Sequence, residues 1–225
     1  MAGTFGLLTS AELWATDVRF LNDEGEGRYG VGIAHEALEA ARLNQPAEVD
    51  RFLQLIEDAL QLATLGPKAG RRFAVSLSGN GDLLSQWRAY GGGGTGCALG
   101  FDTEVLATLH GLECRDVSYD SAEVKVEMAK RLAPVVKDVV ATGVPADDER
   151  VHQAVVVAEE LAAIALSAKH PAFADERELR VSVLGTSPLQ RIRGDEVISY
   201  VPIAVSGLDA VKTIPSLTQI VLGPL

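Results

Sequence analysis

Cysteine and histidine, the side chains that bind most structural metals, are scarce in this chain. The 225 residues include two cysteines and four histidines. Cys97 and Cys114 match no metal-ligand spacing and could form one bridge at most, so we expect both to be reduced and buried. The histidines stand far apart, and no two have the spacing of zinc ligands on a helix. The sequence therefore gives no support for a zinc enzyme. The histidines are His35, His110, His152 and His170.

Long apolar runs and an excess of basic charge are also missing. No window reaches the roughly 18 apolar residues that a membrane span needs. Met1 to Ser10 lack the basic segment and apolar run of a signal peptide. Lys and Arg number 20 against 31 Asp and Glu, a net charge of −11. This balance opposes sequence-independent DNA binding, although a local basic groove is compatible with it. We therefore expect a soluble, cytoplasmic protein without a membrane partner.

The common nucleotide and hydrolase motifs are absent. No glycine-rich loop leads into Lys-Ser or Lys-Thr, and no Gly-x-Ser-x-Gly elbow occurs. Gly91, Gly93 and Gly96 have the spacing of a dinucleotide fingerprint, but we expect a helix before them and a strand after them, the reverse of that motif. The glycine run is then either a flexible loop or a backbone that can lie close to a ligand or another chain.

What the sequence does contain is enough apolar content for a core. Hydrophobic residues make up 47% of the chain, and no repeat or low-complexity linker divides it. We predict a single α/β domain (α+β mixed) over residues 1–225, with a central, largely antiparallel sheet flanked by helices. The glycines between Gly25 and Gly32 indicate a flexible stretch. Strands are expected within 13–21 and at 71–78, 96–102, 178–184, 197–205 and 218–222, and helices at 34–43, 47–65, 82–87, 123–142 and 148–168.

The most informative charged group is Glu176, Glu178 and Arg180. These residues alternate, so they share one face if a strand begins at this point. When two carboxylates lie side by side, their repulsion raises the pKa of one of them, while the arginine keeps the other ionised. Such a group suits a catalytic carboxylate. The alternative is an exposed, salt-bridged strand face.

A second group combines hydroxyls, an amide and aromatic rings. Ser76 and Ser78 end a predicted strand, and the short helix after it carries Gln86, Trp87 and Tyr90. Such a surface can stack a flat ring and fix its polar edge. Packing of Trp87 in the core is the alternative.

A third group lies near the beginning of the chain. One predicted arm brings together an aromatic ring, a cation, an amide and a carboxylate, from Trp14, Arg19, Asn22 and Asp23. Asn22 and Asp23 read on their own as a turn.

Five segments together resemble a large bacterial family known as a domain of unknown function, DUF2971. They follow in the family's order over nearly the whole chain. Family members usually carry a strand ahead of the first segment and a helix and strand after the last, so we expect this chain to lack those outer elements. The segments are residues 13–23, 76–91, 96–101, 169–180 and 220–224.

The layout of these segments also resembles, at the level of fold, the ADP-ribosyltransferases. That resemblance implies NAD as a substrate and a toxin or phage-defence role. Ser76 or Ser78 would lie on the central strand, and Glu178, or Glu176, would be the catalytic glutamate. It implies two sets of site residues. The catalytic set is Glu178, Glu176, Ser76 and Arg180; the set that binds the cofactor is Trp14, Arg19, Asn22, Ser78, Gln86, Trp87 and Tyr90.

Two other functions remain open at this point. The first is a non-catalytic binding module, whose Trp87–Tyr90 surface and glycine loop would contact a protein or a nucleotide. The second is a nuclease that holds Mg²⁺ with Asp175, Glu176 and Glu178. The sequence does not distinguish a protein acceptor from a nucleic-acid acceptor.

Overall fold

In a computed structural model, the chain divides into two compact units. Unit 1 comprises Met1–Asp17, Arg71–Asp116 and Ala174–Leu225; unit 2 comprises Val18–Gly70 and Val117–Phe173. The structure describes residues 7, 9–21, 24–64, 72–92, 95–109, 111–144, 146–185, 187–205 and 216–224.

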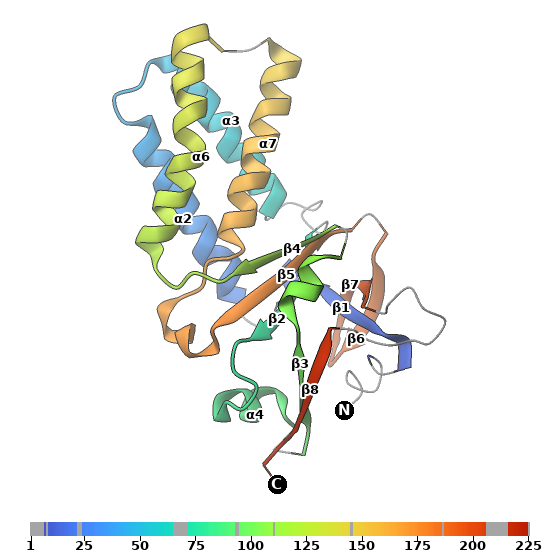
Figure 1. The fold of residues 1–225 in the computed structure, drawn as a ribbon. Helices are drawn as coiled ribbons and strands as arrows, with labels where there is room; N and C mark the ends of the chain where they lie inside the picture. Colours follow the sequence, from blue (N-terminus) through green and yellow to red (C-terminus); the bar gives the residue numbers. More distant parts are fainter. Residues whose placement is uncertain are drawn as a thin grey trace. The chain divides into compact units, whose positions relative to one another are not determined.

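Unit 1 is built on a six-stranded antiparallel sheet with the strand order β4-β5-β2-β1-β7-β6 (Figure 1). The sheet confirms the predicted fold class, a mixture of helices with a largely antiparallel sheet. Its strands are β1 (Glu12–Asp17), β2 (Arg72–Ser78), β4 (Leu112–Asp116), β5 (Glu178–Leu184), β6 (Leu189–Arg193) and β7 (Glu196–Ala204).

The described part of unit 1 also contains a smaller sheet and two short helices after β2. Strands β3 (Cys97–Phe101) and β8 (Leu217–Leu222) pair antiparallel. Helix α4 (Leu84–Tyr90) precedes β3, and α5 (Thr103–Ala107) follows it. A 3-10 segment, η2 (Pro171–Glu176), leads into β5. The order of α4 and β3 is the one expected around the glycine run.

The two faces of the large sheet differ in chemistry because side chains alternate along each strand. One face carries Ala15, Phe73 and Val181, which belong to the buried core of the unit. The register places Thr16, Ser76, Ser78, Glu178 and Arg180 together on the opposite face, which we call the polar face.

Strands β1 and β2 pair over a short distance only. Their ladder consists of Thr16 opposite Ala74 and Asp17 opposite Phe73. Beyond that point β1 continues along β7, while β2 continues along β5 as far as Ser78. The sheet therefore divides between β1 and β2, and we call this division the fork.

The described part of unit 2 contains four α-helices with a shared apolar core. Helices α2 and α3 are joined by a short turn (Figure 1). Phe52, Leu161 and Met128 are among the fully buried core residues. A 3-10 turn, η1 (Val18–Phe20), precedes α2. The helices are α2 (Glu24–Arg42), α3 (Ala47–Thr64), α6 (Ser121–Thr142) and α7 (Asp147–Ala165). No helix in the described part of the chain is both long and apolar enough to cross a membrane.

The stretch between Gly25 and Gly32 is helical, so the prediction of a flexible segment there is wrong. A Cβ built at Gly30 would lie 1.9 Å from the backbone oxygen of Ala165 in α7. A glycine inside a helix lowers the stability of that helix by about 1 kcal/mol relative to alanine. Here the glycine lets α2 and α7 approach closely, and the packing between these helices outweighs the low helix propensity of glycine.

Candidate functional site

Glu178 and Arg180 form an ion pair on the polar face of β5. Arg180 donates from Nε and Nη2 to Oε1 of Glu178, at 2.8 and 2.6 Å. Each residue is 4% exposed. A buried charge is tolerated when it is paired, because pairing offsets the loss of hydration. The prediction that these two residues share a strand face is confirmed, but they are buried rather than an exposed ionic face.

Glu176 lies outside this strand. It ends η2, and Arg177 then takes a left-handed backbone conformation with a φ of 43°. The alternation expected over Glu176, Glu178 and Arg180 therefore does not reach Glu176, because the strand begins at Glu178. The backbone oxygen of Glu176 accepts hydrogen bonds from the Ser78 hydroxyl and the Gly79 amide.

Ser76 and Ser78 lie on the strand next to that ion pair. Ser78 is directly opposite Glu178, and Ser76 is directly opposite Arg180. Both serines are exposed. The Ser78 hydroxyl donates to a backbone oxygen at the end of η2, at 3.0 Å. Ser76 stands beyond the last β1–β2 pair, so its hydroxyl lies at the fork.

Trp14 belongs to a second cluster on the polar face. Its ring centroid is 4.9 Å from that of Tyr200, and it is 38% exposed. The guanidinium carbon of Arg191 is 5.5 Å from each ring centroid. Arg191 Nη2 also donates to Thr16 Oγ1 at 2.9 Å. We call Trp14, Thr16, Arg191 and Tyr200 the Arg191 cluster.

Sequence reasoning found only Trp14 of this cluster. Thr16 follows it at the spacing that shares a strand face, and Tyr200 lies in a predicted strand, so alternation could have added both. Arg191 lies in β6, which the sequence analysis did not predict.

Burial lowers the pKa of Arg191, and the charge of Arg193 lowers it further, against a smaller opposing influence of Tyr200. The lowering reflects the burial of the guanidinium and the positive charge of Arg193 near it. Arg191 remains charged, because arginine loses its proton only at extreme pH.

The residues of α4 do not form one exposed aromatic surface. Trp87 is 6% exposed, and its Nε1 donates to Asp82 Oδ1 at 2.8 Å. Tyr90 is exposed, and Gln86 is half-buried. These contacts correspond to the alternative in which Trp87 packs in the core, since a buried ring whose N–H is hydrogen-bonded has little surface to offer a ligand.

The other residues of the third predicted group lie either in unit 2 or outside the described residues. Arg19 belongs to unit 2, where its guanidinium lies over the ring of Phe20 at 5.7 Å. Asn22 and Asp23 lie outside the described residues.

A further ionic group on the polar face was not predicted. Glu113 in β4 accepts from Arg115 Nε at 2.6 Å and from Arg72 Nη1 at 3.2 Å. Burial raises the pKa of Glu113, but the hydrogen bonds and charges of the two arginines outweigh burial and lower it overall. The group is a structural ion-pair network.

The cysteines are unbridged, as expected, but both are half-buried rather than buried. Burial raises the pKa of the Cys114 thiol, and the charge of Glu113 adds to this. Cys114 is therefore a poor nucleophile. Within the described ranges, no group of three or more His, Cys, Asp or Glu side chains is placed to hold a metal ion.

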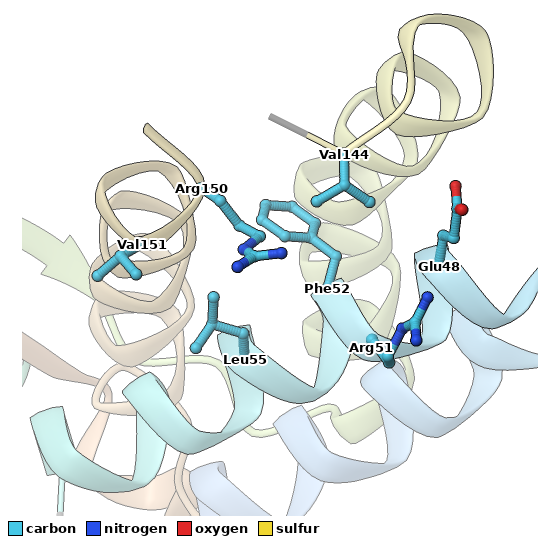
Figure 2. A pocket seen from close by; sticks show the side chains of 7 residues that line it. All are labelled: Glu48, Arg51, Phe52, Leu55, Val144, Arg150 and Val151. Atoms are coloured by element: carbon cyan, nitrogen blue, oxygen red, sulfur yellow. The ribbon is translucent and has the colours of Figure 1, made fainter. Parts of the chain in front are cut away.

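Unit 2 has a pocket of about 500 Å³ at one end of its helices (Figure 2). Phe52 and Leu55 of α3 face Val151 of α7 across it, with the guanidinium of Arg150 between them (Figure 2). Arg150 is held by Asp147. None of the residues predicted to form a site lines this pocket. The remaining lining residues are Glu48, Arg51 and Val144.

Part of the chain matches a family of proteins. No curated protein and no solved structure matches the chain. Residues 86–181 match the model of a protein family described as a protein of unknown function, DUF2971. The matched stretch includes most of α4, the helices α6 and α7, and the beginning of β5 with Glu178 and Arg180. In this central part, the chain is similar to the DUF2971 family.

Proposed function

We propose that unit 1 binds a nucleotide on its polar face, at the fork between β1 and β2. The observation that carries the proposal is the fork itself. It brings an exposed ring on one strand, Trp14, and two exposed hydroxyls on the other, Ser76 and Ser78, to one face of the sheet. A flat apolar surface with a few placed polar groups is typical of sites for ring-containing ligands.

The buried ion pair supports this proposal by fixing the floor of the site. Arg180 and Glu178 hold each other in one geometry beside the two serines. Such support keeps the neighbouring side chains in place, as binding requires. NAD is the first nucleotide to test, because the fold-level resemblance implies it.

Isothermal titration calorimetry with NAD tests the proposal. We expect saturable binding, and we expect Ser76→Val to weaken it by about tenfold because a hydrogen-bonding hydroxyl is lost. Ser199→Ala is the matched control, since Ser199 lies on the other face of the sheet. Equal affinity in Ser76→Val and the wild type would contradict the proposal.

ADP-ribosyl transfer is a second candidate, favoured by one observation. Ser78 and Glu178 are direct neighbours on β2 and β5, and β1 lies on the other side of β2. The fold-level resemblance implies a hydroxyl on the central strand and a late catalytic glutamate. In that reaction the bond between ribose and nicotinamide breaks, nicotinamide leaves with the electron pair, and an acceptor that loses a proton bonds to the ribose. Glu178 would hydrogen-bond the ribose and stabilise its developing positive charge.

Release of nicotinamide from NAD tests the second candidate. Glu178→Gln should abolish it if Glu178 is catalytic. Because Glu178→Gln leaves Arg180 buried without a carboxylate, Glu178→Gln with Arg180→Met serves as the folded control, and it should be equally inactive. Wild-type turnover in either variant would remove this candidate. Binding of NAD without turnover by the wild type would leave the non-catalytic binding module.

A further inference from the structure

The arginines of the polar face differ in how they are neutralised. Arg180 pairs with Glu178, and Arg72 and Arg115 pair with Glu113. Arg193, which shares a strand with Arg191, has Glu196 at 3.5 Å. Arg191 has no carboxylate partner among the described residues, although the protein carries a net charge of −11.

Arg191 is nevertheless held in a defined position. Its guanidinium lies 5.5 Å from the ring centroids of Trp14 and Tyr200, and it donates one hydrogen bond to Thr16. Its Nε is buried and has no hydrogen-bond partner. A buried donor without an acceptor is costly, so a group of this kind requires an explanation.

Arg191 is therefore a cation that is held in one position and has N–H donors without an acceptor among the described residues. The guanidinium has five N–H groups, and the structure gives one acceptor, Thr16 Oγ1. Stacking against the two rings removes much of the rotational freedom that arginine would otherwise lose on binding. Planar guanidinium groups of this kind bind phosphate and carboxylate with two parallel hydrogen bonds.

We propose that Arg191 is the binding site for a phosphate oxyanion, with Trp14, Thr16 and Tyr200 as its positioning residues. The proposal deepens the proposed function, since it assigns the phosphate-bearing part of the nucleotide to β6, β7 and β1. Thr16 lies opposite Ala74 at the edge of the fork, and Ser76 follows Ala74 by two residues on the same face. The Arg191 cluster and Ser76 therefore both border the fork on the polar face.

The test compares ADP with adenosine and pyrophosphate by calorimetry on the full chain. Arg191→Gln should weaken the binding of ADP and of pyrophosphate by about tenfold or more. It should change the affinity for adenosine little, because only ADP and pyrophosphate have an oxyanion. Arg191→Lys should restore part of the affinity, since lysine keeps the charge but loses the planar donor geometry. Arg193→Gln is the matched control: it removes the same charge from the same strand, and it should leave all three affinities within about twofold.

The outcomes separate this inference from the proposed function. If Arg191→Gln weakens pyrophosphate while Ser76→Val changes nothing, the oxyanion site holds and the fork does not bind the nucleotide. An affinity that survives in Arg191→Gln, or falls equally in Arg193→Gln, would overturn the inference. So would a wild-type protein that binds neither ADP nor pyrophosphate at millimolar concentration. Thermal unfolding of each variant checks that the fold is retained, and Arg191→Lys carries the test if Arg191→Gln does not fold.

Discussion

Arg180 directs two hydrogen bonds at a single oxygen of Glu178, and both residues are almost completely buried. Removing one partner of such a pair leaves an uncompensated charge in the interior, whereas replacing both by groups of similar size is often tolerated. The pair is therefore as important for the stability of unit 1 as for any chemistry at its polar face.

The first prediction is that Glu178→Gln destabilises the protein by about 3–5 kcal/mol, because Arg180 loses its carboxylate. Adding Arg180→Met should recover most of that loss. Urea denaturation measures both free energies of unfolding. A loss below about 1 kcal/mol in Glu178→Gln would show that the pair contributes little.

The second prediction concerns the close approach of α2 and α7. Gly30→Ala places a methyl group against the carbonyl of Ala165, so we expect a loss of about 1–3 kcal/mol despite the better helix propensity of alanine. Gly32→Ala is the control, since a Cβ there meets nothing within 4 Å. It should stabilise the helix by up to about 1 kcal/mol. Stabilisation by Gly30→Ala would contradict the close packing.

The third prediction concerns acid stability in unit 2. Burial raises the pKa of Glu57, but hydrogen bonds and charges from Arg42 and His35 outweigh it, so the pKa is lowered overall from 4.5. A lowered native-state pKa means that these contacts stabilise the fold above the unfolded-state value and are lost as the pH falls through the native-state value.

Glu57→Gln should therefore destabilise the protein at neutral pH, and its difference from the wild type should shrink in acid. Urea denaturation at about pH 7 and about pH 3 measures this. Glu36→Gln is the control, because Glu36 pairs with Lys125 at an exposed position and should contribute less than about 1 kcal/mol. A difference for Glu57→Gln that is independent of pH would contradict the assignment.

The fourth prediction separates the two tryptophans. Trp14→Ala should weaken nucleotide binding because it removes an exposed ring from the fork and from the Arg191 cluster. Trp87→Phe should leave binding unchanged and cost about 1 kcal/mol of stability, since it removes the hydrogen bond to Asp82. Calorimetry and urea denaturation measure the two effects. The reverse result would return the ring-binding role to Trp87.

Local pattern was sufficient for several parts of the fold. Apolar alternation gave the bounds of β5 and nearly those of β2, and helical periodicity gave α3 within a residue of its end. Alternation along β5 also placed Glu178 and Arg180 on one face. These features depend on neighbours along the chain, which a sequence displays directly.

Other parts depend on contacts between distant segments. The helical state of the glycines in α2 follows from packing against α7, and the fork follows from how β1 and β2 pair with β7 and β5. Strand β6 was missed because its sequence, Leu-Gln-Arg-Ile-Arg, is mostly polar and exposed. Arg191 and its partnership with Trp14 and Tyr200 were missed with it.

The most direct test of the central claim is the affinity of NAD for the full chain, with and without Ser76→Val. Nucleotide binding at the fork predicts a saturable calorimetric titration that Ser76→Val weakens by about tenfold and Ser199→Ala leaves unchanged. No saturation at millimolar NAD, or one affinity shared by all three proteins, would contradict it.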